Sequence, residues 1–238
     1  NSFDVLEDGY GINLRPLSMF AASAYRDDPC TRFKPHILDQ NIYDVVDPGL
    51  VAKMHKAITV IQFKVEGQII KRHPEYGLNH RCLLEQVDFD KGTVEVDGKT
   101  YPMLDMKFPT IDPKDPLKLT EQEAELLQTL KMSFRHSGLL HKHIKFLYSH
   151  GSMYKCCNNN LLYHGCIPLK KDGSFDDIVF YGIPYSGKAL MDFVDQMVQS
   201  AYFLPESNPD KGVASDFMWY LWCGAKSPLF GKEKMTTF

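Results

Sequence analysis

The chain has 238 residues, of which 44% are hydrophobic, 24% charged and 12% aromatic. These proportions are typical of a soluble globular protein and exclude a disordered, collagen-like or low-complexity chain. With 27 basic and 30 acidic side chains the net charge is −3, so we expect no nucleic-acid or membrane-surface partner. The sequence contains no uncharged apolar run of about 18 residues, so it predicts no membrane span.

Both ends of the chain look cut. The sequence opens at Asn1 without an initiator Met or a signal-peptide pattern, and it stops at Phe238 directly after a loop-like run. We therefore expect the 238 residues to be a piece of a longer polypeptide.

The six cysteines have neither the density nor the spacing of a disulfide framework or a zinc site. They lie at positions 30, 82, 156, 157, 166 and 223. The sequence therefore predicts reduced cysteines and a cytoplasmic protein.

Two helices are predicted in the first third of the chain. Residues 13–26 fit a short helix with Asn13 as its N-cap. The clearest helix covers 48–73, with Asp47 as cap and Pro48 in its first turn. Its apolar residues recur every three or four positions and form one stripe: Val51, Met54, Ile58, Ile61, Val65 and Ile69.

A change of period over 83–108 predicts a β-hairpin, with Asp97-Gly98 as its two-residue turn. After a proline-rich linker, Thr120 and Glu123 have the spacing of a capping box and predict a helix start. Ser137-Gly138 interrupts that helix, and a second helix is predicted up to Gly151.

The last third has a mixed texture. The apolar runs 160–163 and 178–181 are flanked by turn residues and predict buried strands. Helices are predicted at about 187–203 and 213–222. The sequence therefore predicts an α+β protein in which a mostly helical first part precedes a mixed second part.

A nucleotide-binding loop is the first chemical hypothesis. Gly182 to Lys188 fit the pattern G-x-x-x-x-G-K between a predicted strand and a predicted helix. However, Ala189 lacks the hydroxyl that would bind Mg²⁺, and Pro184 removes one backbone amide. We prefer a simple strand-to-helix turn with a solvated Lys188, and keep a P-loop-like nucleotide binder as an alternative.

Other clusters carry weaker signals. Four histidines lack the i, i+4 spacing of helical metal ligands, and we expect them to be surface or hydrogen-bonded residues: His136, His141, His143 and His150. Cys156, Cys157 and Cys166 are expected only to pack against neighbouring side chains.

The segment Leu161 to Pro168 places His164 and Gly165 directly after an apolar strand. A His at the end of a buried strand can point into a ligand site, and the Gly lets the backbone approach a metal or phosphate. From the residues alone, a His packed beside a turn is the simpler interpretation.

Five longer stretches change this balance, because together they resemble class III fructose-1,6-bisphosphatases of bacteria, within the calcineurin-like metallophosphoesterases. The resemblance extends over essentially the whole chain. The stretches are Leu6 to Leu14, Asn160 to Cys166, Gly187 to Asp192, Asp216 to Gly224 and Ser227 to Phe238.

The resemblance implies a two-metal phosphatase that converts fructose 1,6-bisphosphate to fructose 6-phosphate in gluconeogenesis, with Mn²⁺ or Mg²⁺ as the family metal. It transfers one metal ligand, His164. The family's other ligand motifs (D-x-H, G-D-x-x-D-R, G-N-H-D and G-H-x) are absent from the 238 residues. We therefore expect this piece to be inactive by itself.

The resemblance also implies a fold and a substrate surface. Residues 1–151 would be a helical cap or insertion, and 152–238 part of a calcineurin-like αββα core. Lys226 and Lys232 are candidates for holding a phosphate of the sugar bisphosphate. A homo-oligomer is compatible with this reading.

A non-enzymatic alternative is a helical interaction module. In this hypothesis the long helix 48–73 and the aromatic run 219–222 form a surface for a protein partner.

Overall fold

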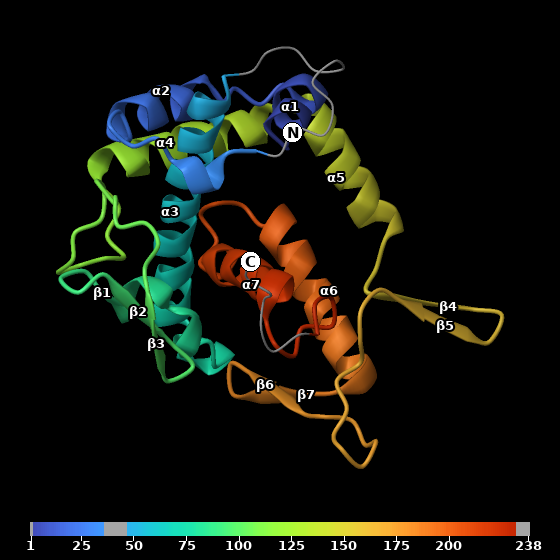
Figure 1. Cartoon of the computed structure of the whole chain (residues 1–238). Coiled ribbons are helices and arrows are strands. Elements are labelled where there is room, and N and C mark those ends of the chain that lie inside the picture. Colours follow the sequence, from blue (N-terminus) through green and yellow to red (C-terminus); the bar gives the residue numbers. More distant parts are fainter. Residues whose placement is uncertain (1, 36–46, 232–238) are drawn as a thin grey trace. The chain divides into compact units, whose positions relative to one another are not determined.

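A computed structural model describes residues 2–35 and 47–231 and has an α+β architecture (Figure 1). The chain divides into two compact units. Unit 1 comprises Asn1–Arg72 and Asn79–Ile144, and unit 2 comprises His73–Leu78 and Lys145–Phe238. Among the described residues, no helix is both long enough and apolar enough to cross a lipid bilayer.

The helices of unit 1 are α1 (Ser2–Asp4), α2 (Arg15–Ala24), α3 (Pro48–Arg72) and α4 (Glu121–His136), and α5 (Gly138–His150) begins in this unit. Shorter helical turns lie at Val5–Gly9, Thr31–Phe33, Asn79–Arg81 and Leu83–Gln86. The predicted helices of this half are all present.

Helix α3 confirms the prediction for residues 48–73. The Asp47 carboxylate accepts hydrogen bonds from the amides of Gly49, at 2.8 Å, and Leu50, at 3.3 Å. The predicted stripe faces inward: Val51, Met54, Ile61 and Ile69 are buried, and Ile58 and Val65 are partly buried. Burial extends beyond this stripe and includes Lys56 and Lys64.

Helix α2 begins later than predicted, because Leu14 and not Asn13 is its N-cap residue. The Asn13 side chain instead accepts a hydrogen bond from the amide of Arg15, at 3.1 Å, which is an Asx-turn just before the helix. The inward face of α2 packs with α3 and α4 in the core of unit 1, through Leu14, Leu17 and Ala21.

The predicted hairpin forms part of a three-stranded antiparallel sheet of β1 (Val87–Asp88), β2 (Thr93–Val96) and β3 (Lys99–Pro102). Asp97 and Gly98 connect β2 to β3 with φ values of 53° and 72°. Two consecutive positive φ angles are the geometry of a type I′ turn, so the Asp97-Gly98 prediction is confirmed.

The capping box of α4 is also confirmed. The Thr120 hydroxyl accepts from the Glu123 amide at 3.2 Å, and a Glu123 carboxylate oxygen accepts from the Thr120 amide at 2.8 Å. The helix ends at Ser137, as predicted, and the Ser137 hydroxyl donates to the carbonyl of Tyr10 at 2.6 Å.

Unit 2 contains β4 (Tyr154–Cys157), β5 (Asn160–Tyr163), β6 (Ile178–Phe180), β7 (Ile183–Tyr185), α6 (Gly187–Phe203) and α7 (Asp210–Cys223), with a short helical turn at Pro74–Tyr76. The strands form two antiparallel hairpins. An aromatic cluster packs α6, α7 and β6 together: the Phe180 ring lies 5.6 Å from Phe193 and 5.1 Å from both Phe217 and Tyr220.

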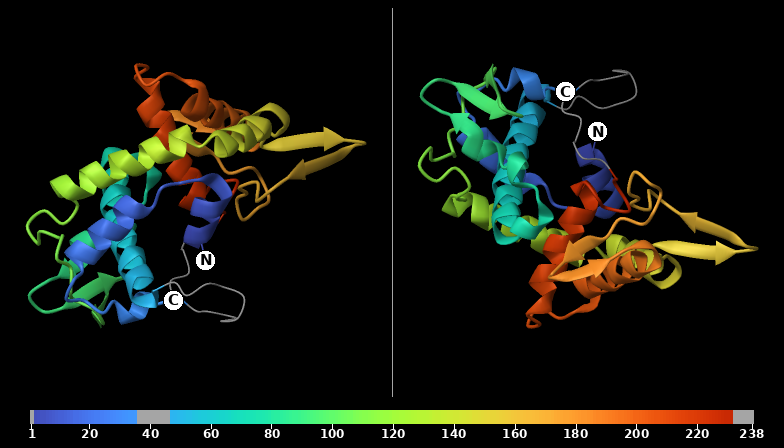
Figure 2. Two further views of the ribbon diagram at one scale, coloured as in Figure 1. Left: turned by 90° about the horizontal axis from the view of Figure 1, so that it is seen from above. Right: turned by 90° about the horizontal axis from the view of Figure 1, so that it is seen from below.

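One expectation about unit 2 is wrong. The 160–163 strand was expected to be buried, but Leu161, Leu162 and Tyr163 are 47%, 55% and 46% exposed. The reason is that β5 pairs within the described chain only with β4, and a two-stranded ribbon has no third strand or second layer to cover it. Both views of Figure 2 show this hairpin extending away from α6.

The 178–181 run is half buried. Ile178 and Phe180 point inward with 6% and 2% exposure, whereas Val179 and Tyr181 are 52% and 41% exposed. Such alternation is typical of a strand with one covered face. The next helices agree with the sequence, except that α7 begins at Asp210, three residues before the predicted start.

Candidate functional site

Two segments singled out by the sequence come together in unit 2. The loop after β5, which begins at His164, lies against the turn after α7. The Cys166 amide donates to the Pro228 carbonyl at 2.9 Å, and the Cys166 thiol donates to the Ser227 carbonyl at 3.5 Å. Burial raises the pKa of that thiol, so Cys166 is a neutral hydrogen-bond donor here and not a thiolate.

Gly165 is needed for this contact. A Cβ atom at this position would overlap the Pro228 carbonyl oxygen and crowd the backbone of Leu229. The sequence had suggested that the glycine lets the backbone approach a metal or phosphate. In the structure, the group it approaches is the protein backbone of the 227–231 turn.

That turn is held by buried Ser227. Its hydroxyl donates to the Leu221 carbonyl at 2.7 Å and accepts from the Leu229 amide at 3.1 Å. The Ser227 carbonyl also accepts from the Gly231 amide at 2.8 Å. Gly231 has φ +60°, and a Cβ there would overlap the Cys166 sulfur. The turn is therefore a preformed platform for the His164 loop.

Lys226 stands at the edge of this platform. Its ammonium group lies 2.7 Å from Asp176 Oδ2, and the Asp176 amide donates to the Pro168 carbonyl at 3.0 Å. Half of the Lys226 side chain remains exposed, so it can still meet a ligand. Lys232, the other lysine predicted to bind substrate, lies outside the described residues.

His164, the first residue of the loop after β5, is exposed. Within residues 2–35 and 47–231, no group of three or more His, Cys, Asp or Glu side chains is arranged to hold a metal ion. A two-metal centre needs several ligands and bridging oxygens, and a single imidazole does not supply them. The described residues therefore do not fit a complete metal centre.

Comparison with known proteins decides the family. The profile of the family described as Firmicute fructose-1,6-bisphosphatase matches residues 1–238, the whole chain. The chain belongs to this family. Among curated relatives named "Fructose-1,6-bisphosphatase class 3", those of Clostridium tetani, Finegoldia magna and Listeria monocytogenes are 52%, 51% and 49% identical to it. No solved structure matches the chain significantly.

The chain is much shorter than these family members. The alignments cover all of it but only 36% to 37% of each of the three relatives. Measured against them, the chain is a fragment, and most of their length has no counterpart in the 238 residues.

The structure argues against a nucleotide-binding loop at Gly182 to Lys188. The middle of the G-x-x-x-x-G-K pattern is strand β7, which pairs with β6, so its amides do not form a phosphate cradle. The Lys188 ammonium lies 2.5 Å from an Asp192 oxygen and the side chain is largely exposed. The preferred interpretation, a turn with a solvated lysine, agrees with this geometry.

The structure also argues against an interaction module that uses helix 48–73 and the aromatic run 219–222 as its surface. Eleven residues of α3 are buried, so the long helix is the centre of unit 1 and not a free surface. In the aromatic run, Tyr220 and Leu221 are buried as well, and Trp222 is 69% exposed.

The secondary histidines behave as expected. His136, His141, His143 and His150 are all exposed, and His136 and His150 hydrogen-bond carbonyls of their own helices. The expectation that Cys156 and Cys157 simply pack is wrong, because both are exposed on the β4–β5 hairpin.

Unit 2 contains a buried histidine that no sequence pattern predicted. His73 lies between two carboxylates, with Nδ1 2.8 Å from Glu75 and Nε2 3.1 Å from Asp216, and its ring stacks on Tyr76 at 4.7 Å. The sequence pattern predicted only that a helix ends at His73. Asp216 is 143 residues away, so no local pattern could have revealed the pair.

Proposed function

We propose that the chain is part of a fructose-1,6-bisphosphatase that removes the 1-phosphate of fructose 1,6-bisphosphate in gluconeogenesis, in the cytoplasm. The match of the family profile to all 238 residues is the observation that carries this proposal. The names of the relatives, at about half identity, support the same substrate. The protein would be a hydrolase whose substrate is a small sugar bisphosphate, and a homo-oligomer is compatible with it.

The two parts of the chain that the sequence distinguishes have separate roles in this proposal. Residues 1–151 would be the helical cap or insertion, and 152–238 would be part of a calcineurin-like αββα core. Most of the family's length lies outside the 238 residues, and the described residues do not complete a metal site. The chain by itself would therefore be inactive, and the longer enzyme would use Mn²⁺ or Mg²⁺.

Phosphate release tests the activity directly. The full-length protein should release phosphate from fructose 1,6-bisphosphate, lose activity in a chelator and regain it with Mn²⁺. The 238-residue chain should release none under either condition. A full-length protein that hydrolyses other phosphate esters but not this bisphosphate would contradict the proposal.

His164 is proposed as a metal ligand, because it is exposed at the end of β5 and stands on a preformed platform. His164→Ala in the full-length enzyme should reduce kcat by at least about a hundredfold and weaken Mn²⁺ activation. His136→Ala is the matched control, since His136 is also exposed and hydrogen-bonds the Met132 carbonyl of its own helix. Equal activity of both variants at saturating Mn²⁺ would remove His164 from the site.

Lys226 and Lys232 are proposed to hold a phosphate of the substrate. Lys226→Ala should raise KM by about tenfold, with a smaller change in kcat, if the lysine mainly binds substrate. Asp176→Ala is the control, because it removes the ion-pair partner while leaving the lysine in place. If both variants behave alike, Lys226 acts only through its ion pair with Asp176.

A further inference from the structure

The β4–β5 hairpin has two chemically different faces. Side chains alternate along a strand, and directly paired residues share a face. The register pairs Tyr154 with Tyr163 and Cys156 with Leu161, and these four residues form what we term the apolar hairpin face. The opposite face carries Lys155, Cys157, Asn160 and Leu162.

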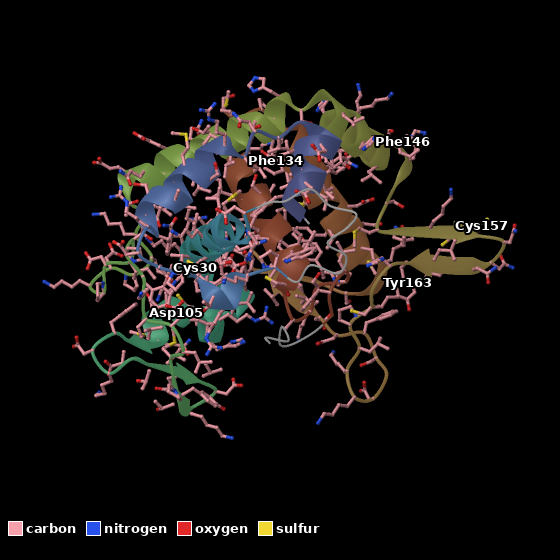
Figure 3. The ribbon with its side chains drawn as sticks, turned by 45° about the horizontal axis from the view of Figure 1, so that its top comes forward. Cys30, Asp105, Phe134, Phe146, Cys157 and Tyr163 are labelled. Carbon is pink, nitrogen blue, oxygen red and sulfur yellow. The ribbon has the colours of Figure 1, made fainter. Side chains whose placement is uncertain are left out.

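At the base of the apolar hairpin face, Tyr154 is partly covered by helix α6. The Tyr154 hydroxyl donates to Asp192 of α6 at 3.0 Å, and the Lys188 ammonium lies 5.7 Å from the centre of the Tyr154 ring. The other residues of this face are exposed: Cys156 is exposed, and Leu161 and Tyr163 are 47% and 46% exposed. Figure 3 shows Cys157 near the tip of the hairpin and Tyr163 closer to its base.

The hairpin is regular despite this exposure. Asn158 and Asn159 connect its strands with φ values of 49° and 60°, a turn matched to the twist of a two-stranded ribbon. Within the described residues β4 and β5 pair only with each other, so both outer edges have unpaired backbone groups. Contiguous exposed apolar side chains beside open strand edges are typical of a surface that another segment covers.

The lengths of the relatives indicate what covers the apolar hairpin face. The chain accounts for only 36% to 37% of their length. We propose that the apolar hairpin face is an internal interface of the full-length protein, covered by the part of the polypeptide outside these 238 residues. That part packs on Cys156, Leu161 and Tyr163, while the face with Lys155 and Asn160 stays in contact with solvent. The inference rests on family membership and does not depend on the reaction.

Two adjacent cysteines on opposite faces provide the test. Cys157→Ser leaves Cys156 as the hairpin thiol, and Cys156→Ser leaves Cys157. In the 238-residue chain both thiols should react with a maleimide at similar rates. In the full-length protein Cys156 should react at least about tenfold more slowly, and Cys157 should change by less than about threefold. Buried Cys30, Cys82 and Cys223 should react slowly in both proteins.

Two results would overturn the proposal. One is equal reactivity of Cys156 in the full-length protein and the 238-residue chain. The other is slow reaction of Cys156 in the 238-residue chain that speeds up on dilution, because this would identify a second copy as the partner. Slower reaction of both hairpin thiols in the full-length protein would contradict the part of the proposal that leaves the face with Lys155 and Asn160 in contact with solvent.

A pair of leucine variants gives a second readout. Leu161 and Leu162 have similar exposure but lie on opposite faces. Leu161→Asp should lower the thermal midpoint of the full-length protein by about 5 °C or more, and Leu162→Asp by clearly less. Equal losses from the two variants would contradict the assignment of the covered face. Neither readout uses phosphatase activity, so a failed assay of the proposed function leaves both interpretable.

Discussion

Unit 1 and unit 2 differ in how completely they cover their own apolar side chains. In unit 1 the long helix α3 is surrounded by α2, α4 and short turns, and even two of its lysines are fully buried. In unit 2 an aromatic cluster is buried around Phe180, but the β4–β5 hairpin is exposed. Unit 2 therefore leaves more of its large apolar side chains exposed than unit 1 does.

Unit 1 also buries charged side chains. The Lys56 ammonium lies 2.5 Å from Asp28 and 2.7 Å from Asp105, and that of Lys64 lies 2.7 Å from Glu123. Buried charges are tolerated only when they are paired and hydrogen-bonded. The buried lysines of unit 1 thus find their partners inside that unit. In unit 2 the buried His73 likewise lies between Glu75 and Asp216, while Lys188 and Lys226 form exposed pairs.

The largest effect is expected from breaking a buried pair in unit 1. Lys64→Met leaves the fully buried Glu123 carboxylate without its cation and should lower the free energy of unfolding by about 3–5 kcal/mol. Denaturant unfolding followed by circular dichroism measures this loss. Trp219 and Trp222 both lie in unit 2. Their fluorescence therefore reports the unfolding of unit 2, whereas circular dichroism reports the unfolding of both units.

The control for that variant removes both charges. Lys64→Met combined with Glu123→Gln should recover part of the loss, because Gln can still accept from the Thr120 amide at the helix start. A single variant as stable as the wild type would show that the pair is hydrated and that unit 1 is less closed than its packing indicates.

A slightly smaller effect is expected in the aromatic cluster of unit 2. Phe180 is 2% exposed, and Phe180→Ala should lower the free energy of unfolding by about 3 kcal/mol through the cavity it leaves. Val179→Ala on the exposed side of the same strand should change it by less than about 0.5 kcal/mol. Tryptophan fluorescence during denaturation measures both, and equal losses would contradict the observed orientation of β6.

Gly165→Ala should have an intermediate effect. The added Cβ would force the His164 loop away from the Pro228 carbonyl, at a cost of about 1–3 kcal/mol. Hydrogen exchange at the Cys166 amide, which donates to that carbonyl, should speed up. Gly212→Ala, where nothing lies within 4 Å of the new atom, should leave this exchange unchanged. Unchanged exchange in Gly165→Ala would mean that the platform is not rigid.

The smallest effect concerns pH. Burial opposes ionisation of Asp28, but hydrogen bonds from Lys56 and the Cys30 amide outweigh it and hold the pKa of Asp28 below its ordinary value. Because the folded pKa is lower than the unfolded one, this stabilisation is present above about pH 4 and is lost as the pH falls through the folded pKa. Asp28→Asn should flatten this part of the stability profile of unit 1. An identical acid profile for both proteins would contradict this role.

Local patterns predicted much of this fold. The Asp47 cap, the Asp97-Gly98 turn and the Thr120 capping box are all present, because each depends on residues a few positions apart. The candidate site was predicted less fully. The sequence singled out the His164 loop and Lys226, but not that the Ser227 turn supports that loop or that Asp176 holds that lysine.

By itself, the sequence determined the helices, the tight turns and the family, since these depend on local spacing and on long matching stretches. Only the tertiary structure decided which groups are covered. It buried Lys56 and Lys64 beside carboxylates 28 to 59 residues away along the chain, and it left Leu161 exposed. Burial depends on which distant segments of the chain contact a side chain. The hydrophobicity of one residue does not specify which distant residues will pack against it.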